Sequence, residues 1–267
     1  MTTDFLAVQK DIAAIREMYS AQPYNDKLRA ILYGRVGSGK TTTVGTAPYP
    51  ILLHSFDPGG EKVLKPLIDS GKVVVQTFYD EDPRKPTQFE SWRNAVAKAE
   101  NNDWFGRVFK TYCVDSITML SEAALNLAVI KHPPKTKDGL PDQGTYKHQI
   151  AIVRDNLKYL TSLPCHVILT GHITSEKDEL TGRVHQYLLI SPSLRSRTPM
   201  VYDELWVMDL VRSSTSSKRW IVTDAGGELE ARTRIGAGGK LADREEPDIT
   251  AILKKCGMDW QAGEVIK

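Results

Sequence analysis

Apolar residues along the chain form short continuous runs that alternate with stretches of helical periodicity. The runs have the length and the Val, Ile and Leu content of strands buried on both faces, and they cover residues 29–33, 51–56, 73–78, 110–114, 166–170 and 205–211. Helical spacing is clearest over residues 88–99, 117–131 and 147–162. This alternation predicts an α/β fold with a mainly parallel sheet, helices on both faces and ligands at the carboxyl ends of the strands.

The pattern changes towards both ends of the chain. Apolar positions in residues 4–18 predict a short helix that packs either on its own domain or on a neighbouring subunit. Segments 219–223 and 228–232 flank the turn sequence Asp-Ala-Gly-Gly and predict a β-hairpin that closes one edge of the sheet. A last helix is expected from Pro247 to about Lys255.

These patterns divide the chain into three parts. Residues 1–27 hold the N-terminal helix, a candidate oligomerisation element. Residues 28–236 form the expected core, and residues 237–267 form a linker with a short helix. We find no internal repeat that would change this division.

Composition narrows the class of protein. A chain of 267 residues that is 41% hydrophobic can bury one sizeable core, and its formal net charge of +2 gives no overall basic field for nucleic acid. No apolar stretch is long enough to span a bilayer, and residues 1–6 lack a signal-peptide pattern, so we expect a cytoplasmic protein with no membrane partner. The three cysteines are widely spaced and are expected to be reduced: Cys113, Cys165 and Cys256.

Residues 34–41 read Gly-Arg-Val-Gly-Ser-Gly-Lys-Thr, a complete phosphate-loop pattern directly after a strand-like run. Its glycines allow backbone N–H groups to point at phosphate oxygens. Lys40 is expected to reach the β- and γ-phosphates, and Thr41 to place its hydroxyl on Mg²⁺. The loop therefore predicts ATP and Mg²⁺ as ligands, with contacts from Gly34, Arg35, Val36, Gly37, Ser38, Gly39, Lys40, Thr41 and Thr42.

Three later strand ends carry polar side chains suited to phosphate chemistry. Asp115 is a candidate metal ligand, although an acid at this place is often only the N-cap of the next helix. Asp57 is a candidate to polarise the attacking water, with Glu61 as its substitute, but Asp-Pro-Gly-Gly is also ordinary turn sequence. His172 is a candidate sensor of the γ-phosphate, the alternative being a plain surface residue.

In this order the motifs resemble those of the RecA-like P-loop ATPases, most of all a compact phage group, the RecA-like single-strand annealing or phage nucleotide-binding proteins. The likeness covers about residues 28–236. It matches Asp57 to the catalytic glutamate, His172 to the γ-phosphate-sensing glutamine and Asp115 to the metal-binding aspartate of RecA. It implies a slow or DNA-stimulated ATPase in the host cytoplasm, assembled as a ring or filament on single-stranded DNA and promoting annealing or strand exchange in phage recombination.

The resemblance also gives a role to residues 231–236, Ala-Arg-Thr-Arg-Ile-Gly. They are similar to a basic element that many RecA-like filaments and ring helicases present to the nucleotide of the neighbouring subunit. Arg232 and Arg234 would then stabilise charge on the γ-phosphate in trans. The alternative is a pair of arginines on one solvated strand face, and Arg195 and Arg197 are weaker candidates for the same trans role.

Two polar stretches, residues 131–139 and 173–187, lie where RecA-like proteins carry DNA-binding loops. Their punctuation with Pro and Gly predicts mobile loops that a partner orders, although acidic residues in the second argue against a simple basic groove. Tyr146 and Tyr187 are candidates to stack on bases, with plain packing as the alternative. The candidate phosphate contacts are Lys135, Lys137, Lys177 and Arg183.

Near-neutral charge keeps a second function open. The chain is alternatively a nucleotide-gated assembly or partner-loading module that does not act on DNA directly. A single-strand-binding protein is a further candidate partner of the chain. A small-molecule kinase would need a basic lid and an acceptor pocket, and the sequence offers a clear signal for neither.

Overall fold

A single mixed sheet organises the computed structural model, which describes residues 5–22, 25–136, 139–180, 182–213, 216–226 and 229–266. Parallel pairing joins six strands, and β7 is followed by antiparallel partners at one edge. In spatial order the strands are β3 (Val73–Thr77), β2 (Ile51–Ser55), β4 (Thr111–Asp115), β5 (His166–Lys177), β1 (Arg29–Gly34), β7 (Glu204–Arg212), β8 (Ser217–Val222) and β9 (Arg244–Glu245). Every strand predicted from an apolar run is present, so the expected mainly parallel α/β fold is confirmed.

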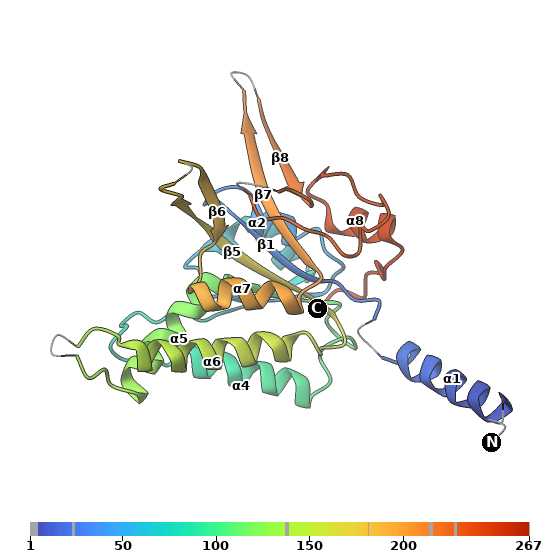
Figure 1. Cartoon of the computed structure of the whole chain (residues 1–267), viewed down its shortest axis with the longest axis horizontal. Coiled ribbons are helices and arrows are strands. Elements are labelled where there is room, and N and C mark those ends of the chain that lie inside the picture. The colour runs from blue at the N-terminus through green and yellow to red at the C-terminus, as the bar shows by residue number, and fades with distance from the viewer. Residues whose placement is uncertain are drawn as a thin grey trace.

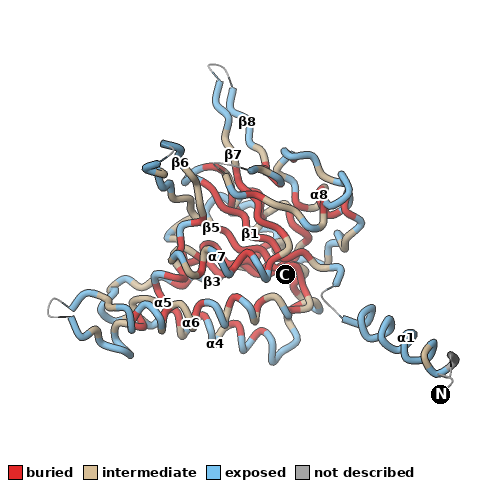
Figure 2. Tube along the Cα trace, viewed as in Figure 1, coloured by how far each residue is buried: buried red, intermediate tan, exposed pale blue. Residues whose placement is uncertain are grey.

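Helices cover both faces of the sheet and bury a separate apolar cluster on each (Figures 1 and 2). One face carries α4 (Gln88–Asn101), α5 (Ile117–Lys131), α6 (Gln143–Leu160) and α7 (Pro192–Val201). The other carries α2 (Lys40–Val44), the 3₁₀ helix η1 (Gly60–Leu64), α3 (Lys65–Asp69) and α8 (Ile249–Cys256). With the sheet buried on both sides, its strands need the continuous apolar runs seen in the sequence.

Polar caps decide where the long helices begin and end. Helix α6 starts four residues before the predicted 147, because the side chain of Asp142 accepts a hydrogen bond from the N–H of Thr145 at 2.9 Å. Helix α8 is capped in the same way by Asp248, and it ends at Gly257, whose φ of 71° is left-handed. The expected C-terminal helix is therefore confirmed, with its bounds shifted by one to two residues.

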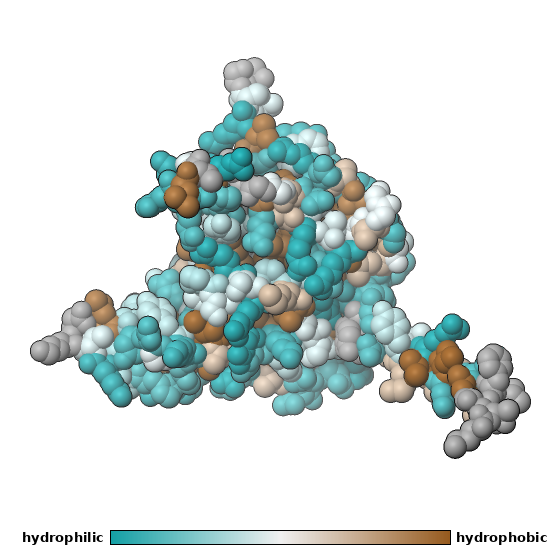
Figure 3. All heavy atoms as spheres, viewed as in Figure 1, coloured by the Kyte–Doolittle hydropathy of each residue, from teal (hydrophilic) through white to brown (hydrophobic). Residues whose placement is uncertain are grey.

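The N-terminal helix α1 (Phe5–Ser20) stands away from the rest of the chain (Figure 1). Its residues 9–20 are all exposed (Figure 2). Apolar side chains gather on it in Figure 3, and those exposed are Ile12, Ile15, Met18 and Tyr19. Packing of this helix on its own domain, one of the two expectations, is not found.

The antiparallel C-terminal edge is present, but its hairpin joins other segments than the sequence suggested. Strand β8 pairs with β7, from Arg212 opposite Ser217 to Val207 opposite Val222. Segment 229–232, expected as the second arm, makes only isolated bridges. The physical reason is burial, because pairing with β7 places Ile221 and Val222 in the core.

The second polar stretch is also ordered in an unforeseen way. Strand β5 continues to Lys177 and pairs antiparallel with β6 (Val184–Leu188), so much of residues 173–187 forms a β-hairpin instead of a mobile loop. Leu188 is buried against the core at the base of this hairpin. A shift of register by one residue would move Leu188 to the opposite face, so its burial favours the observed pairing.

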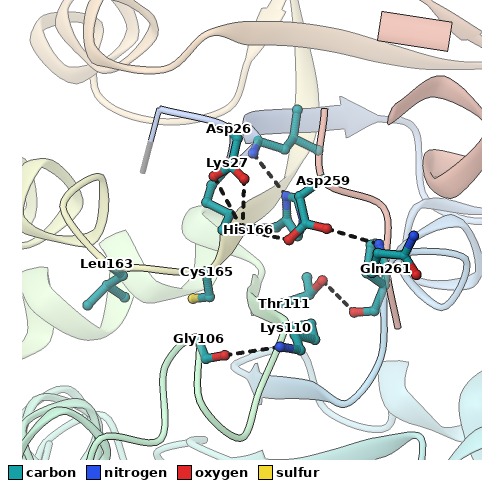
Figure 4. Close-up of polar contacts among 12 residues, drawn as sticks. Asp26, Lys27, Gly106, Lys110, Thr111, Leu163, Cys165, His166, Asp259 and Gln261 are labelled. Atoms are coloured by element: carbon teal, nitrogen blue, oxygen red, sulfur yellow. Dashed lines mark hydrogen bonds and ion pairs between the residues drawn. The ribbon is translucent and has the colours of Figure 1, made fainter. Parts of the chain in front are cut away.

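The C-terminal tail runs across the amino ends of the strands. Lys27, just before β1, forms an ion pair with Asp259 at 2.6 Å, beside His166 at the start of β5 (Figure 4). Further along, the N–H of Gly263 donates to the carbonyl of Tyr49 before β2. The tail thus closes the end of the sheet opposite the phosphate loop.

Two expectations from composition also meet the structure. All three cysteines are free and buried, as expected for reduced thiols. Burial raises the pKa of Cys165 to about 12, so its thiol is protonated at neutral pH. In the part of the chain that the structure describes, no helix combines the length and the apolar character needed to cross a membrane.

Candidate functional site

The phosphate loop lies at the carboxyl end of β1, where glycine is required at several positions. A Cβ on Gly34 would lie 2.7 Å from the carbonyl oxygen of Met208 on β7, which leaves no room for a side chain. Gly37 and Gly39 have φ values of 75° and 103°. These left-handed conformations suit glycine and turn the loop into α2. The sequence pattern is therefore matched by the backbone geometry that a phosphate loop needs.

Lys40 closes over its own loop. Its side-chain ammonium donates to the carbonyl oxygens of Gly34 and Arg35, each at 3.1 Å, and the residue is only 6% exposed. Burial lowers the pKa of Lys40, whereas the nearby Asp115 and Asp57 act in the opposite direction. The ammonium therefore lies beside two carboxylates, held by weak acceptors that a phosphate can replace.

Asp115 lies at the end of β4 and is 2% exposed. One carboxylate oxygen accepts from the hydroxyl of Thr41 at 2.7 Å, and the other accepts from the hydroxyl of Thr170 on β5. Burial raises the pKa of Asp115, and the two hydroxyls counteract part of that rise. The N-cap of α5 is Ser116, whose hydroxyl accepts from Met119, so the capping alternative for Asp115 is not found.

Thr41 and Asp115 together offer the oxygen donors that suit Mg²⁺. Mg²⁺ is usually held by one or two protein oxygens together with substrate phosphates and water. Among the described residues, no group of three or more His, Cys, Asp and Glu side chains is arranged to hold a metal by itself. The donor set therefore fits a metal shared with a bound nucleotide.

Asp57 and His172 meet across the sheet although 115 residues separate them. One carboxylate oxygen of Asp57 lies 2.9 Å from Nε2 of His172, and the other accepts from the hydroxyl of Ser116 at 2.8 Å. Burial raises the pKa of Asp57, but the hydrogen bonds from His172 and Ser116 outweigh it, and the net pKa lies below the ordinary value. Nδ1 of His172 is buried without a hydrogen-bond partner among the described residues.

These side chains face one cavity of about 310 Å³. It is lined by Lys40, Thr41, Asp57, Asp115 and His172, and by Arg219 from β8. Val36, Gly37, Gly39 and Thr42 of the loop and Gly60 and Val63 of η1 complete its wall. Arg35 and Ser38 line a neighbouring cavity of about 500 Å³. Glu61, the predicted substitute for Asp57, is not among its lining residues.

Cavity volume alone would have indicated a different site. A larger cavity of about 520 Å³ lies between α4 and α6, lined in part by Trp92, Arg93 and Tyr159. It contains no phosphate-loop backbone and no pair of facing carboxylate and ammonium groups. The smaller cavity is the candidate site because of its chemistry.

Two lining or supporting residues were missed at the sequence level. Thr170 is the last residue of a predicted strand, so its polar side chain beside the metal candidate could have been noticed from its position. Arg219 gave no such signal, because its approach to the loop depends on the pairing of β8 with β7. Which strands pair at the edge of a sheet depends on tertiary packing and not on local sequence.

The trans candidates lie away from this cavity. Arg232 bridges to Leu205 near the amino end of β7, and its guanidinium donates to the carbonyl oxygens of Pro199 and Tyr202 at the end of α7. Arg234 donates to the carbonyl of Met200 at 3.1 Å, and its side chain remains 50% exposed. Neither arginine joins the site of its own chain.

The weaker trans candidates, Arg195 and Arg197, lie on α7 itself. Arg195 pairs with Glu176 at 2.7 Å and lies over the ring of Tyr187. Arg197 is exposed. Because Arg195 covers Tyr187, one face of that ring is already occupied, whereas Tyr146 is 43% exposed.

The candidate DNA contacts lie on separate elements. Lys135 is exposed in the connection between α5 and α6, and its N–H donates to Asp142 at 3.0 Å. Lys177 and Arg183 are exposed at the end of the β5–β6 hairpin, which lies apart from that connection in Figure 1. Lys137 lies outside the described residues. The structure therefore does not bring these residues into one group.

Comparison with known proteins adds a family. A family model described as an AAA domain matches residues 26–235. No curated protein matches the chain. Three similar solved structures are at most 16% identical in sequence to the chain, with TM-scores below 0.5.

The chain is 16% identical to a prototypical ATPase from the type III secretion system of pathogenic bacteria, with a TM-score of 0.46; 68% of this chain is covered but only 51% of the other. The flagellar accessory protein FlaH of Methanocaldococcus jannaschii has 12% identity, coverage of 82% and 83%, and a TM-score of 0.44. A KaiC-like protein of Pyrococcus horikoshii is 13% identical, with 72% of this chain and 76% of the other covered and a TM-score of 0.38. The chain thus spans about half the length of the secretion ATPase. The RecA-like P-loop fold itself is evident from the strand order, with β5 between β1 and β4, and from the loop geometry.

Proposed function

The chain belongs to the AAA domain family, and on that premise we propose that it binds and hydrolyses ATP with Mg²⁺ at the carboxyl ends of its parallel strands. One observation carries the proposal. Side chains from the carboxyl-end region of four different parallel strands converge on a single cavity of about 310 Å³, namely Lys40, Thr41, Asp57, Asp115 and His172. A core that needed only to fold would not collect two carboxylates and an ammonium group there.

Each residue has a distinct part in the proposed reaction. The loop N–H groups and Lys40 hold the phosphates, the ammonium exchanging its loop carbonyls for phosphate oxygens. Thr41 and Asp115 would hold Mg²⁺, which supplies neutralisation of the charge on the phosphates. Asp57, ionised because of its hydrogen bonds from His172 and Ser116, orients the attacking water.

His172 is placed to report on the terminal phosphate. Its Nε2 is committed to Asp57, whereas Nδ1 has no partner among the described residues. A γ-phosphate that draws the imidazole away from Asp57 would free that carboxylate for water. The same strand, β5, continues from His172 into the hairpin that carries Lys177.

The test is calorimetric titration of the protein with ATP, with and without Mg²⁺, together with phosphate release. We expect ATP binding and measurable turnover, both dependent on Mg²⁺. Thr41→Ala should weaken the Mg²⁺ dependence, and Thr87→Ala is the matched control, because Thr87 is exposed and does not line the cavity. Absence of ATP binding by the wild-type protein would reject the proposed function.

We further propose that this ATPase assembles on single-stranded DNA and promotes annealing or strand exchange in phage recombination. The sequence resemblance supports this, and so does the direct continuation of β5 from the site into the β5–β6 hairpin, where Lys177 and Arg183 are exposed. Binding through such residues should weaken as salt rises. Fluorescence anisotropy of labelled single-stranded DNA, with ATP and Mg²⁺ at low and high salt, measures this affinity and its salt dependence.

The alternative is a nucleotide-gated assembly or partner-loading module. This alternative is favoured by the acidic residue Glu176 on the same hairpin, which forms an ion pair with Arg195 at 2.7 Å. The double variant Lys177→Ala, Arg183→Ala should lose DNA affinity, while Lys65→Ala, on an exposed helix elsewhere, should not. If the wild-type protein hydrolyses ATP but binds no DNA at low salt, the alternative holds.

Assembly is proposed to complete the site. The exposed apolar side chains of α1 suit contact with a second copy, with residues 28–236 as the ATPase core. Both trans candidates donate to carbonyl oxygens at the end of α7, but Arg234 is more accessible, because its side chain is 50% exposed whereas Arg232 is half-buried. Arg234→Ala should lower turnover of the assembled protein and leave ATP binding by the monomer intact; weaker binding by the monomer would contradict a trans role.

A further inference from the structure

Arg219 reaches the phosphate loop from an edge strand. It lies on β8 opposite Leu210 of β7, and its Nε donates to the carbonyl oxygen of Ser38 at 3.1 Å. Its Cδ lies 2.8 Å from the position that a Cβ on Gly39 would take. The second half of the loop is therefore in direct contact with a guanidinium group of the same chain.

We propose that Arg219 binds the phosphates of the nucleotide in cis, as a second cation beside Lys40. The inference rests on the proposed function and adds a residue to it. Arg219 lines the same cavity as Lys40, Asp57 and Asp115. Of its five N–H donors, only the one on Nε has a hydrogen-bond partner among the described residues.

The charges in the cavity call for such a group. Without ligand, one ammonium faces two carboxylates, from Asp57 and Asp115. A nucleotide polyphosphate adds further negative charge, of which Mg²⁺ neutralises only a part. A guanidinium presents several donors in a planar fork that matches phosphate oxygens. Arg219 supplies it without help from another subunit.

Strand order indicates which phosphates Arg219 contacts. The loop follows β1; β8 lies on one side of it, beyond β7, whereas Asp57 and His172 come from β2 and β5 on the other side. Arg219 contacts Ser38 and approaches Gly39, and it shares no hydrogen-bond partner with Asp57 or His172. It therefore binds phosphates that ATP and ADP have in common, away from the proposed water and γ-phosphate sensor.

The opposite face of β8 provides a control. Lys218 lies next to Arg219 in the chain but points the other way, because neighbouring side chains of a strand alternate. Its Nζ lies 3.8 Å from the centre of the Trp220 ring and pairs with Glu246. Lys218→Ala removes a cation from the same strand without touching the cavity.

The experiment compares Arg219→Ala, Arg219→Gln and Arg219→Lys with Lys218→Ala. We expect Arg219→Ala and Arg219→Gln to weaken binding of both ATP and ADP by about tenfold, the effect of one charge-assisted hydrogen bond. KM for ATP should rise in proportion and kcat should change less. Arg219→Lys should recover part of the affinity, and Lys218→Ala should match the wild type.

Thermal unfolding without nucleotide separates binding from a structural tie between hairpin and loop. The inference requires that nucleotide affinity falls in the variants that unfold at the wild-type temperature. Unchanged affinity for ATP and ADP in Arg219→Ala or Arg219→Gln, while the wild type binds both, would overturn the inference and leave the proposed function standing. Absence of binding by the wild type would overturn both.

Discussion

The two ends of the central sheet both gather charged side chains, and they use them in opposite ways. At the amino end, Arg29 is 4% exposed and donates to the carbonyl oxygens of four residues, Leu28, Thr161, Leu163 and Cys165. At the carboxyl end, Lys40, Asp57 and Asp115 face one another across a cavity. A buried charge therefore indicates a ligand site here only where its neighbours are other ionisable groups and open volume.

Two histidines, His166 and His172, also differ between the two ends of the sheet. His166, at the amino end, accepts from the N–H of Leu28 at 3.0 Å, and burial lowers its pKa to about 4. It is neutral and its accepting nitrogen is satisfied by backbone. Each ring keeps its other nitrogen buried without a partner among the described residues, Nε2 in His166 and Nδ1 in His172. The difference lies in the bonded nitrogen, which in His172 contacts the carboxylate of Asp57 beside the candidate cavity and in His166 contacts a backbone N–H.

The largest predicted effect is at the carboxyl end. Lys40→Ala should abolish detectable ATP binding and lower turnover by about 10²–10³-fold or more, because it removes the ammonium that holds the phosphates. The free energy of unfolding should fall by about 2–4 kcal/mol at most, since two hydrogen bonds from the ammonium to the loop are lost. Calorimetry, phosphate release and chemical denaturation measure these. Turnover that stays within twofold of Lys65→Ala would remove the phosphate-loop assignment.

Asp57→Asn should separate chemistry from binding. Asparagine keeps the size of the side chain but cannot draw a proton from water, so kcat should fall by about 10²-fold while ATP affinity is largely kept. Glu61→Gln is the matched variant, because Glu61 does not line the cavity. Steady-state turnover decides between them, and a larger loss in Glu61→Gln than in Asp57→Asn would transfer the role to Glu61.

Arg29→Met should show the opposite profile at the amino end. It leaves carbonyl oxygens buried without a donor and should lower the free energy of unfolding by about 4 kcal/mol. ATP affinity of the folded protein should stay at the wild-type value, since Arg29 does not line the site. Denaturant midpoints compared with exposed Arg154→Ala give the result, and a loss of ATP affinity without loss of stability would break the contrast between the two ends.

The smallest predicted effect is on the pH dependence of stability, through His166 at the amino end of the sheet. His166 titrates near 6.5 when unfolded and at about 4 when folded, so the unfolded state binds more protons between these values. The stability that neutral His166 provides is complete above pH 6.5 and is lost as pH falls towards 4, on the order of 3 kcal/mol. Lys27, Arg29 and Asp259 face the ring and modify this value.

His166→Asn isolates the contribution of this group. Its amide oxygen can accept from the N–H of Leu28 without titrating, so the variant should lose less stability than the wild type between pH 6.5 and 4. Urea denaturation across that range measures the difference. Parallel pH profiles of the two proteins would show that His166 is not the group responsible.

Much of the fold was predictable because its signals are local. The phosphate loop follows a strand at Gly34, and the polar residues Asp57 and Asp115 directly follow or end buried strands. Parallel strands with helical crossovers bring such ends to one edge, so the grouping of these residues follows from order alone. His172 differs only in lying inside a strand that runs on into a hairpin.

Other features could not be predicted, because they depend on which segments pair. The turn at residues 224–227 looked like the centre of a hairpin, yet β8 pairs with β7 instead, and this brings Arg219 to the loop. The tail has no strong pattern, but it crosses the amino ends of the strands through Asp259 and Gly263. Antiparallel edge pairing and tail docking carry little periodicity that would select a partner.

The sequence by itself determined the alternation of strands and helices, the phosphate loop and the acids at the strand ends, because each depends on residues close together in the chain. The tertiary structure alone decided which end of the sheet is closed and which is open. It also decided that Asp57 meets His172 and that Arg219 lines the same cavity as Lys40. These contacts join residues far apart in sequence, and they depend on which strands pair, in the middle of the sheet for Asp57 and His172 and towards its antiparallel edge for Arg219.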